Sequence, residues 1–151
     1  MKRKRLALIL GVVLGLPVII GGTILFRIPA TIQQSAQFTR HAVTVLCQPW
    51  TESRLDAFLS PASFNRGKDF KKVMAGASKK YGAVRRFKMG GASPSTTSDN
   101  NQRRMTVSYN VYAECDKARA VVGLEVMEEG DKWIIRNLNV REPAPFEENS
   151  F

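Results

Sequence analysis

Side chains able to carry out acid–base, nucleophilic or metal chemistry are few in this sequence of 151 residues. It holds one histidine, His41, and two cysteines, Cys47 and Cys115. A general base needs a partner within hydrogen-bond reach, and a zinc ion needs several converging ligands. No ligand pair has motif spacing, and His41 lies off the apolar stripe of its predicted helix, where we expect a solvated side chain. The sequence therefore predicts no catalytic residue, no metal site and no cofactor.

Three carboxylates could still act singly if a cavity surrounded them. Glu114 and Glu125 alternate with apolar residues on predicted strands, and Asp56 lies on a predicted short helix. A buried carboxylate with a raised pKa would mark a general base. The other interpretation is that the glutamates are the polar residues that a half-open antiparallel sheet exposes to water. We favour this second interpretation and predict that the protein is not an enzyme.

The two cysteines allow two interpretations. In an oxidising compartment Cys47 and Cys115 could form a disulfide joining a helix to a strand, worth about 4 kcal/mol by the chain-entropy estimate. Alternatively both are free thiols that pack as small apolar residues. The sequence has no C-x-x-C redox motif. Spacing alone leaves both interpretations open, because the distance between the two Cα atoms decides whether a bridge can form.

Basic residues cluster in one segment, at Lys68, Lys71, Lys72, Lys79, Arg85 and Arg86. This cluster could contact anionic lipid headgroups or an acidic partner, or it could simply be a solvated helix face. Removing positions 1–26 from the chain leaves 19 Lys+Arg against 13 Asp+Glu. That excess is modest, and together with a predicted export signal it argues against nucleic acid as a partner.

Helical periodicity dominates the first half of the chain after position 30. Residues 31–47 place apolar side chains at 3.6-residue spacing, and Thr51 could cap a short helix. Ser60-Pro61 is a typical helix start, and Gly82 is a typical stop after Tyr81. We therefore predict three helices before residue 83.

From residue 83 the apolar period changes to two. We predict a strand over residues 83–92, a polar loop over "SPSTTSDNNQ" and a strand from Met105 to Cys115. After a turn, a return strand follows with core residues Ala120, Val122, Leu124 and Val126. The last strand is expected to place Ile134, Leu138 and Val140 on its core face, with Trp133 and Ile135 on the other face.

The N-terminus reads as a membrane anchor. Four basic residues at positions 2–5 precede 21 uncharged residues, which as a helix span about 30 Å. A cleaved signal peptide is the alternative, but the run is long and Pro29 makes a poor cleavage site. Gly11 and Gly15 could pack two such helices together, although glycine is common in membrane helices. We predict a cytoplasmic tail (1–5), an anchor (6–27), a domain outside the cytoplasm (28–142) and a flexible tail (143–151).

Two short motifs carry a family resemblance over residues 32–141. A helix ends in Lys80-Tyr81-Gly82 before the first strand, and Glu129-Gly130-Asp131-Lys132-Trp133 opens the last strand. In this the chain resembles the cystatin-like α+β roll of the nuclear-transport-factor-2-like superfamily, among small exported bacterial domains with no assigned activity. The resemblance implies helices packed on a roughly four-stranded antiparallel meander, with a cavity between helices and sheet. Its members include enzymes, scaffolds and dimerisation modules, so the fold alone selects no function.

The sequence-based hypothesis is a single-pass inner-membrane protein whose periplasmic α+β domain does not catalyse a reaction. We expect it to bind other envelope proteins, or a second copy of itself, through the open face of the sheet. Tyr112, Glu114 and Trp133 are the candidates for that face, because aromatic residues supply anchoring area at low entropy cost. The alternative is a small-ligand pocket between helices and sheet, with or without weak enzymatic activity.

Overall fold

A computed structural model describes residues 30–61, 64–99 and 102–151. The predicted anchor, with Gly11 and Gly15, lies outside these residues. Contacts divide the chain into two units, Met1–Gln34 and Ser35–Phe151, and the fold described below is that of the second. Among the helices that the structure describes, none combines the length and apolar composition needed to cross a bilayer.

Three helical segments precede the sheet. The first helix is described over residues 30–47, η1 is a 3-10 helix from Glu52–Phe58, and α2 runs from Phe64–Tyr81. Phe70, Met74, Ala77 and Tyr81 recur every three or four residues along α2 and are buried. Gly82 then ends the helix with a positive φ of 78°, and its N–H donates to the Ser78 carbonyl at 3.0 Å. Helices are present in all three predicted segments, but Thr51 makes no side-chain cap bond and α2 begins at Phe64, not at the predicted Ser60-Pro61.

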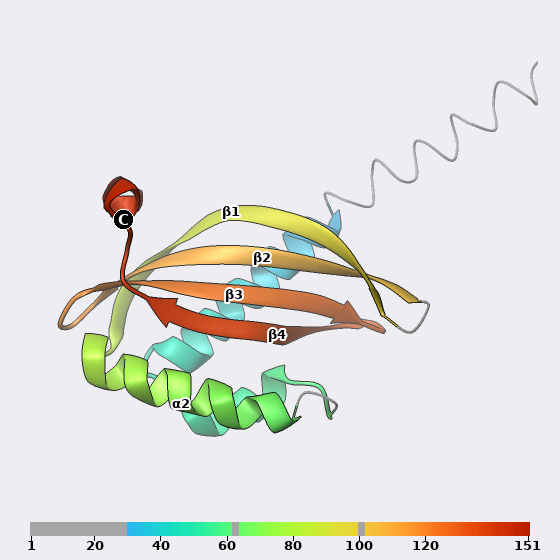
Figure 1. Ribbon diagram of the computed structural model, residues 1–151, viewed down its shortest axis with the longest axis horizontal. Helices are drawn as coiled ribbons and strands as arrows, with labels where there is room; N and C mark the ends of the chain where they lie inside the picture. The colour runs from blue at the N-terminus through green and yellow to red at the C-terminus, as the bar shows by residue number, and fades with distance from the viewer. Residues whose placement is uncertain (1–29, 62–63, 100–101) are drawn as a thin grey trace, which may run out of the picture. The chain divides into compact units, whose positions relative to one another are not determined.

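The sheet is a four-stranded antiparallel meander (Figure 1). Its strands are β1 (Val84–Asp99), β2 (Gln102–Cys115), β3 (Arg119–Glu129) and β4 (Lys132–Arg141), in the order β1-β2-β3-β4. Short turns join β2 to β3 and β3 to β4, and the second of these contains Gly130, which has a φ of 67°. This confirms the predicted α+β class with helices packed on a meander.

One face of the sheet, called the core face here, packs against the helices. Cross-strand neighbours on it are Val107 with Val126 and Val111 with Val122. These valines are fully buried and share one cluster with Val43 of the first helix. The predicted period-two alternation of β2 and β3 is confirmed. Such alternation is expected of strands that bury one face against helices and leave the other face exposed.

The first hairpin is longer than the sequence indicates. Residues 93–99, predicted to belong to a loop, continue β1 and pair with β2 as far as Asp99 opposite Gln102. Ser93, Pro94 and Ser95 are exposed, so main-chain pairing rather than apolar burial extends the strand. Pro94 is tolerated because β1 is an edge strand of the sheet.

The alternation of β4 is broken by a β-bulge. Val126 lies opposite Ile135, whereas the adjacent Glu125 lies opposite Asn137, so Arg136 is the extra residue. As a consequence Ile135, rather than the predicted Ile134, shares the core face with Leu138 and Val140. The predicted assignment of these two isoleucines to the faces of the sheet was therefore wrong. One extra residue in a strand moves every side chain on the far side of the bulge, here those before Arg136, to the opposite face.

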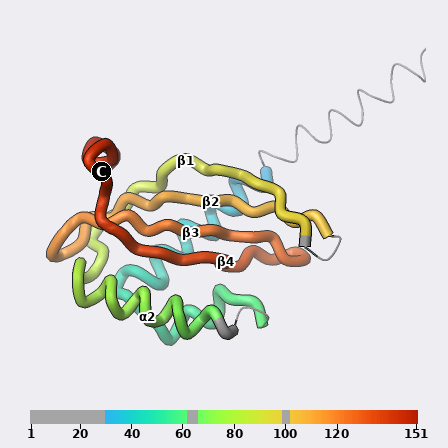
Figure 2. The backbone as a smooth tube through the Cα atoms, viewed as in Figure 1, coloured from blue at the N-terminus to red at the C-terminus, as the bar shows by residue number. Residues whose placement is uncertain are grey.

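Within the predicted flexible tail, the structure has a 3-10 helix, η3 (Pro145–Ser150). Figure 2 shows it at the end of the sheet where β1 begins and β2 ends. The buried carboxylate of Glu147 receives two hydrogen bonds from the Arg141 guanidinium, at 2.6 and 2.8 Å. It also accepts the Ala144 N–H at 2.9 Å. These charge-assisted bonds fix the segment to the end of β4.

Candidate docking face

The face of the sheet opposite the core face is called the outer face here. Its centre consists of two cross-strand rows, Ser108–Glu125–Asn137 and Asn110–Gly123–Asn139. The serine and the three asparagines are exposed, while Gly123 and Glu125 are partly buried. In Figure 1 the first helix passes on the far side of the sheet, and α2 lies along β4. The centre of the outer face is thus a polar surface rich in carboxamide groups.

Gly123 determines the shape of this centre. A Cβ at position 123 would stand 2.5 Å from Asn139 Oδ1 and 2.7 Å from Asn139 Nδ2. The missing side chain therefore lets the Asn139 amide lie close over the backbone of β3. The result is a shallow hollow of about 120 Å³, lined in part by Asn110, Asn137 and Asn139. Within the described residues these three amides have no hydrogen-bond partner, so their donors and acceptors are available to another molecule.

One end of the outer face is closed by an arginine that reaches across the sheet. Arg136 lies 3.4 Å from Glu125 Oε1 and donates to Thr97 Oγ1 at 3.1 Å. Thr106 is buried at this end, and its hydroxyl lies 3.4 Å from that of Thr97. The bulge at Arg136 aims this side chain along the outer face, which is a recurrent use of bulges.

The opposite end holds an aromatic and charged groove of about 280 Å³. Its lining residues come from β1, β2 and the C-terminus: Arg86, Phe87, Lys88, Tyr112, Glu114 and Phe151. The Tyr112 and Phe151 rings meet edge to face with centroids 5.4 Å apart, and the Arg119 guanidinium lies 5.1 Å from the Phe151 centroid. On the neighbouring η3, Phe146 exposes 82% of its surface, so its ring is accessible as an aromatic anchor for a partner.

The candidate carboxylates are each paired with a base. Glu114 forms an ion pair with Arg86, and this hydrogen bond lowers the pKa of Glu114 below its usual value. Glu125 pairs with Arg136, and Asp56 lies 3.2 Å from Lys71 Nζ. A general base active near neutral pH needs a raised pKa, whereas Glu114 is held as a carboxylate ion. The arrangement at Glu114 suits charge pairing rather than proton transfer.

The structure brings together two of the three predicted face residues. Tyr112 and Glu114 lie on the outer face and line the same groove. Trp133 lies opposite Glu128, on the side of the sheet that carries Val126, and packs against the hydrophobic core. Its placement beside Tyr112 was wrong for the same reason as that of Ile134, since the bulge inverts the start of β4. His41 is exposed, with its ring 5.8 Å from that of Phe58.

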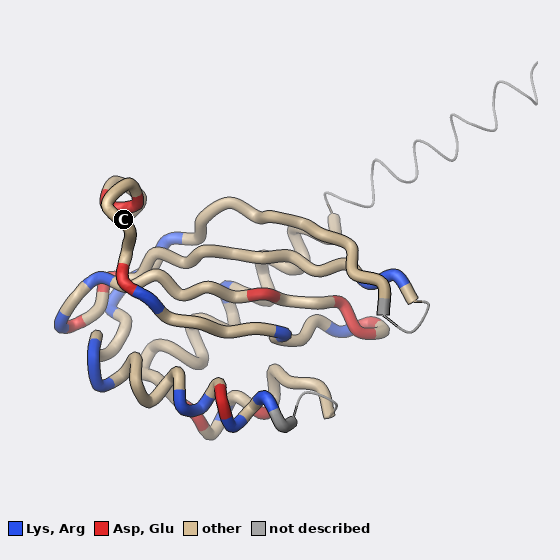
Figure 3. The backbone as a smooth tube through the Cα atoms, viewed as in Figure 1, with Lys and Arg blue, Asp and Glu red and all other residues tan. Residues whose placement is uncertain are grey.

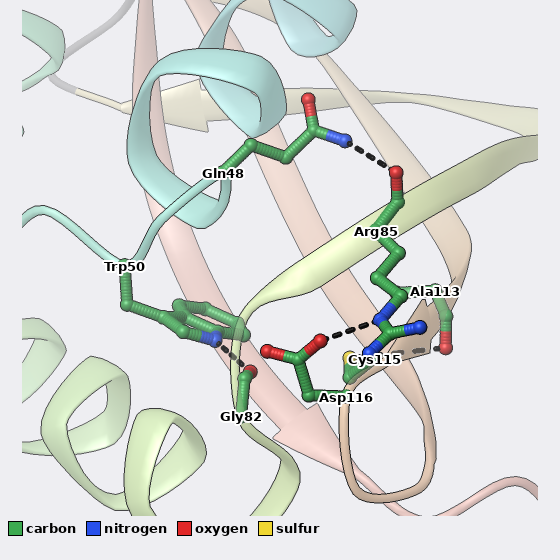
Figure 4. A network of polar contacts seen from close by, with 7 residues as sticks. All are labelled: Gln48, Trp50, Gly82, Arg85, Ala113, Cys115 and Asp116. Carbon is green, nitrogen blue, oxygen red and sulfur yellow. Dashed lines mark hydrogen bonds and ion pairs between the residues drawn. The ribbon is translucent and has the colours of Figure 1, made fainter.

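Cys47 and Cys115 are both free in the structure, so the disulfide interpretation was wrong and the free-thiol interpretation holds. Cys47 is buried at the end of the first helix, and burial raises its pKa to about 12. Cys115 is half-buried at the end of β2, with its pKa raised by burial to about 11. Figure 4 shows Cys115 next to the Arg85–Asp116 ion pair, with its thiol directed at the Ala113 carbonyl. Both thiols serve as small packing groups.

The predicted basic cluster separates into paired and unpaired residues. Lys71 pairs with Asp56, Arg85 with Asp116 and Arg86 with Glu114. Lys68, Lys72 and Lys79 remain exposed on α2, where Figure 3 shows several basic positions along the helix. The cluster is therefore divided: half of it forms ion pairs between elements, and the other half has no ion-pair partner among the described residues.

The amide centre of the outer face was missed by sequence reasoning. Asn137 and Asn139 alternate with apolar residues on β4, as Ser108 and Asn110 do on β2, so a signal was present. That the four meet around Gly123 follows from strand register, which one sequence does not display. Comparison with protein-family models, curated sequences and solved structures yields no significant match for this chain. The proposal of a docking face therefore rests on the geometry of this domain.

Proposed function

We propose that this chain is a single-pass, membrane-anchored domain outside the cytoplasm that binds other envelope proteins, or a second copy of itself, through the outer face. It acts as a non-catalytic assembly domain of the cystatin-like α+β roll type. The observation that carries the proposal is the row Asn110–Gly123–Asn139, whose amides are exposed and unpaired in the described structure. Polar rows of this kind form intermolecular hydrogen bonds when a partner covers them.

Three further features support a protein partner. The exposed Phe146 and the Tyr112–Phe151 pair place aromatic side chains at the end of the polar centre. Aromatic anchors beside hydrogen-bonding groups are typical of protein interfaces. The groove at Tyr112 also carries charges of both signs, in Arg86, Lys88 and Glu114, which gives a partner a fixed orientation.

Location rests on the sequence. The 21 uncharged residues at positions 6–26 have the length of a bilayer-spanning helix, and the basic residues at positions 2–5 favour a cytoplasmic N-terminus. Fractionation of cells expressing the full chain tests this part. Recovery with the membrane, and protease digestion of the domain only from the outer side of that membrane, are the expected results.

The docking face is tested by site-specific photo-crosslinking in intact cells. A photoreactive phenylalanine analogue is placed at Asn110 or Asn139 of the full chain, and at Arg54 of η1 as an exposed control. We expect discrete adducts from positions 110 and 139, identified by mass spectrometry, and none from position 54.

A second variant separates a specific interface from random collisions. Replacing Asn139 by arginine in the chain carrying the analogue at position 110 puts a bulky charge in the hollow, and the adduct at position 110 should disappear. Adducts that survive this substitution, or that form equally at position 54, would contradict docking through the outer face. An adduct consisting only of the chain itself would identify the partner as a second copy.

A further inference from the structure

Helix α2 carries a strong excess of positive charge. Its 18 residues contain one acid, Asp69, and six bases: Arg66, Lys68, Lys71, Lys72, Lys79 and Lys80. Two of these bases are neutralised by neighbours, because Lys71 lies 3.2 Å from Asp56 and Lys80 lies 2.8 Å from Glu142. For Lys68, Lys72 and Lys79 the described part of the chain supplies no carboxylate within ion-pair distance.

The three unpaired lysines form a narrow stripe along the helix, called the lysine face here. At 100° per residue, Lys72 is turned by about 40° and Lys79 by about 20° from Lys68, and the stripe is about 16 Å long. Met74, which is fully buried in the core, is turned by about 240° from Lys68. The lysine face therefore points away from the hydrophobic core, whereas the paired Lys71 and Lys80 stand on the two flanks.

The exposed residues between Lys72 and Lys79 on the stripe have small side chains. Ala75 lies on the stripe between Lys72 and Lys79, and a Cβ built at the adjacent Gly76 would meet nothing within 4 Å. The helix thus offers three exposed ammonium groups beside small side chains, with no aromatic residue between them. A broad planar surface can approach such a helix along its whole length.

We propose that the lysine face binds the surface of an anionic phospholipid bilayer. The lysine face has none of the aromatic or arginine side chains that act as anchors in protein interfaces, and lysine and alanine are depleted at such interfaces. Charge attraction to lipid phosphates requires neither anchors nor pockets. The inference goes beyond the proposed docking function, concerns a different part of the domain, and applies whether or not the chain carries its own anchor.

The effect of the three lysines on membrane partition follows from the charge. A lysine near an anionic bilayer surface increases partition about fivefold, so three lysines increase it about 100-fold. Screening reduces this gain, because the Debye length falls from about 10 Å at 0.1 M salt to about 3 Å at 1 M salt. Binding through the lysine face is therefore expected at low salt and lost at high salt.

Lysine footprinting tests the proposal on the full chain. The chain is reconstituted in vesicles of phosphatidylcholine alone or with about 30 mol % phosphatidylglycerol, and acylated with a membrane-impermeant amine reagent. With Lys88 of β1 as internal reference, we expect Lys68, Lys72 and Lys79 to be acylated several-fold more slowly in anionic than in neutral vesicles. The protection should disappear in high salt. Equal acylation in both kinds of vesicle would overturn the proposal.

Two charge-matched variants identify the responsible residues. K68Q/K72Q/K79Q removes the lysine face, whereas R40Q/R54Q/K132Q removes three exposed bases located outside α2. The acylation of Lys71 and Lys80, on the flanks of the stripe, reports on both. The first variant should lose the protection that depends on anionic lipid, and the second should keep it. Equal loss in both variants would indicate attraction by net charge alone and would overturn the proposal.

Flotation separates this proposal from that of the anchor. A chain that fails to float with neutral vesicles has no anchor, which contradicts the proposed location but leaves the lysine face to be tested. Its partition onto anionic vesicles then measures α2 directly, with a loss of about 100-fold expected for K68Q/K72Q/K79Q. A loss below about threefold, or binding to an anionic polymer but not to vesicles, would overturn the lipid assignment.

Discussion

Alanine at position 123 is expected to change the free energy of unfolding by an amount that depends on residue 139. In the native chain the Asn139 amide occupies the space that a Cβ of residue 123 would fill, at 2.5 Å from Oδ1, 2.7 Å from Nδ2 and 2.9 Å from Cγ. Every one of these distances is too short for real contacts. In the variant Gly123→Ala, the Asn139 side chain must therefore rotate, which it can do because it is exposed.

Two terms of similar size determine the result. Replacing glycine by alanine inside a strand stabilises the fold by about 0.5–1 kcal/mol, because glycine loses more conformational freedom on folding. Forcing Asn139 off its rotamer costs about 0.5–1.5 kcal/mol. G123A alone should then change the free energy of unfolding by less than about 1 kcal/mol. In the Asn139→Ala background the clash is absent, so G123A should stabilise by about 0.5–1 kcal/mol.

Urea unfolding of the full chain in detergent micelles, followed by the fluorescence of Trp50 and Trp133, measures all four members of this cycle. The expected coupling energy between positions 123 and 139 is about 1 kcal/mol, above the additivity error of about 0.3–0.5 kcal/mol. A coupling energy of zero would refute the placement of the Asn139 amide over Gly123. The same displacement should weaken photo-crosslinking from position 110, so the cycle also connects the geometry of the hollow to docking.

Three further outcomes are expected. At pH 8 both thiols should react with maleimide more slowly in the folded chain than in urea-unfolded protein, about 100-fold more slowly at Cys115 and about 1000-fold at Cys47. The reason is that their pKa values rise from 9.0 to about 11 and about 12, respectively. Equal rates in folded and unfolded protein, measured by mass spectrometry, would contradict the burial of Cys47. The pKa of Glu147 falls from 4.5 to about 2 beside Arg141. Its contribution to the free energy of unfolding is therefore complete above pH 4.5 and is lost as the pH falls toward 2. Urea unfolding between these pH values should show a weaker pH dependence of stability for E147Q than for the native chain. Met74→Ala should lower the free energy of unfolding by about 2–5 kcal/mol, because the Met74 side chain of α2 is fully buried in the core. A loss below about 1 kcal/mol in a urea titration would show that α2 is loosely packed.

Local patterns were enough to predict the order of the elements. The alternation from Met105 to Cys115 and the return from Ala120 to Val126 define a face that must be buried, and the structure buries it. Gly82 and Gly130, each with positive φ, mark where a helix and a hairpin end. Such features depend on residues close together in the chain, so sequence reasoning reaches them.

Features that depend on pairing between distant residues were not predictable in this way. The bulge at Arg136 changes which of Ile134 and Ile135 lies on the core face, and nothing in "KWIIRNLNV" indicates an extra residue. The polar end of β1 pairs through its main chain, so its side chains give no strand signal. The division of the basic cluster is similar, because Arg86 meets Glu114 only through the register of β1 on β2.

The two proposed contact surfaces do not compete for the same residues. The centre of the outer face is formed by β2, β3 and β4, and the lysine face is formed by the side of α2 that points away from the core. Lys71 and Lys80, on the flanks of the stripe, form ion pairs with Asp56 and Glu142, whereas the three lysines of the stripe keep an uncompensated positive charge. A domain resting on lipid through three lysines would still expose Asn110 and Asn139 to a protein partner. Crosslinking from position 110 should therefore survive K68Q/K72Q/K79Q, whereas loss of the adduct in that variant would show that the two surfaces act as one.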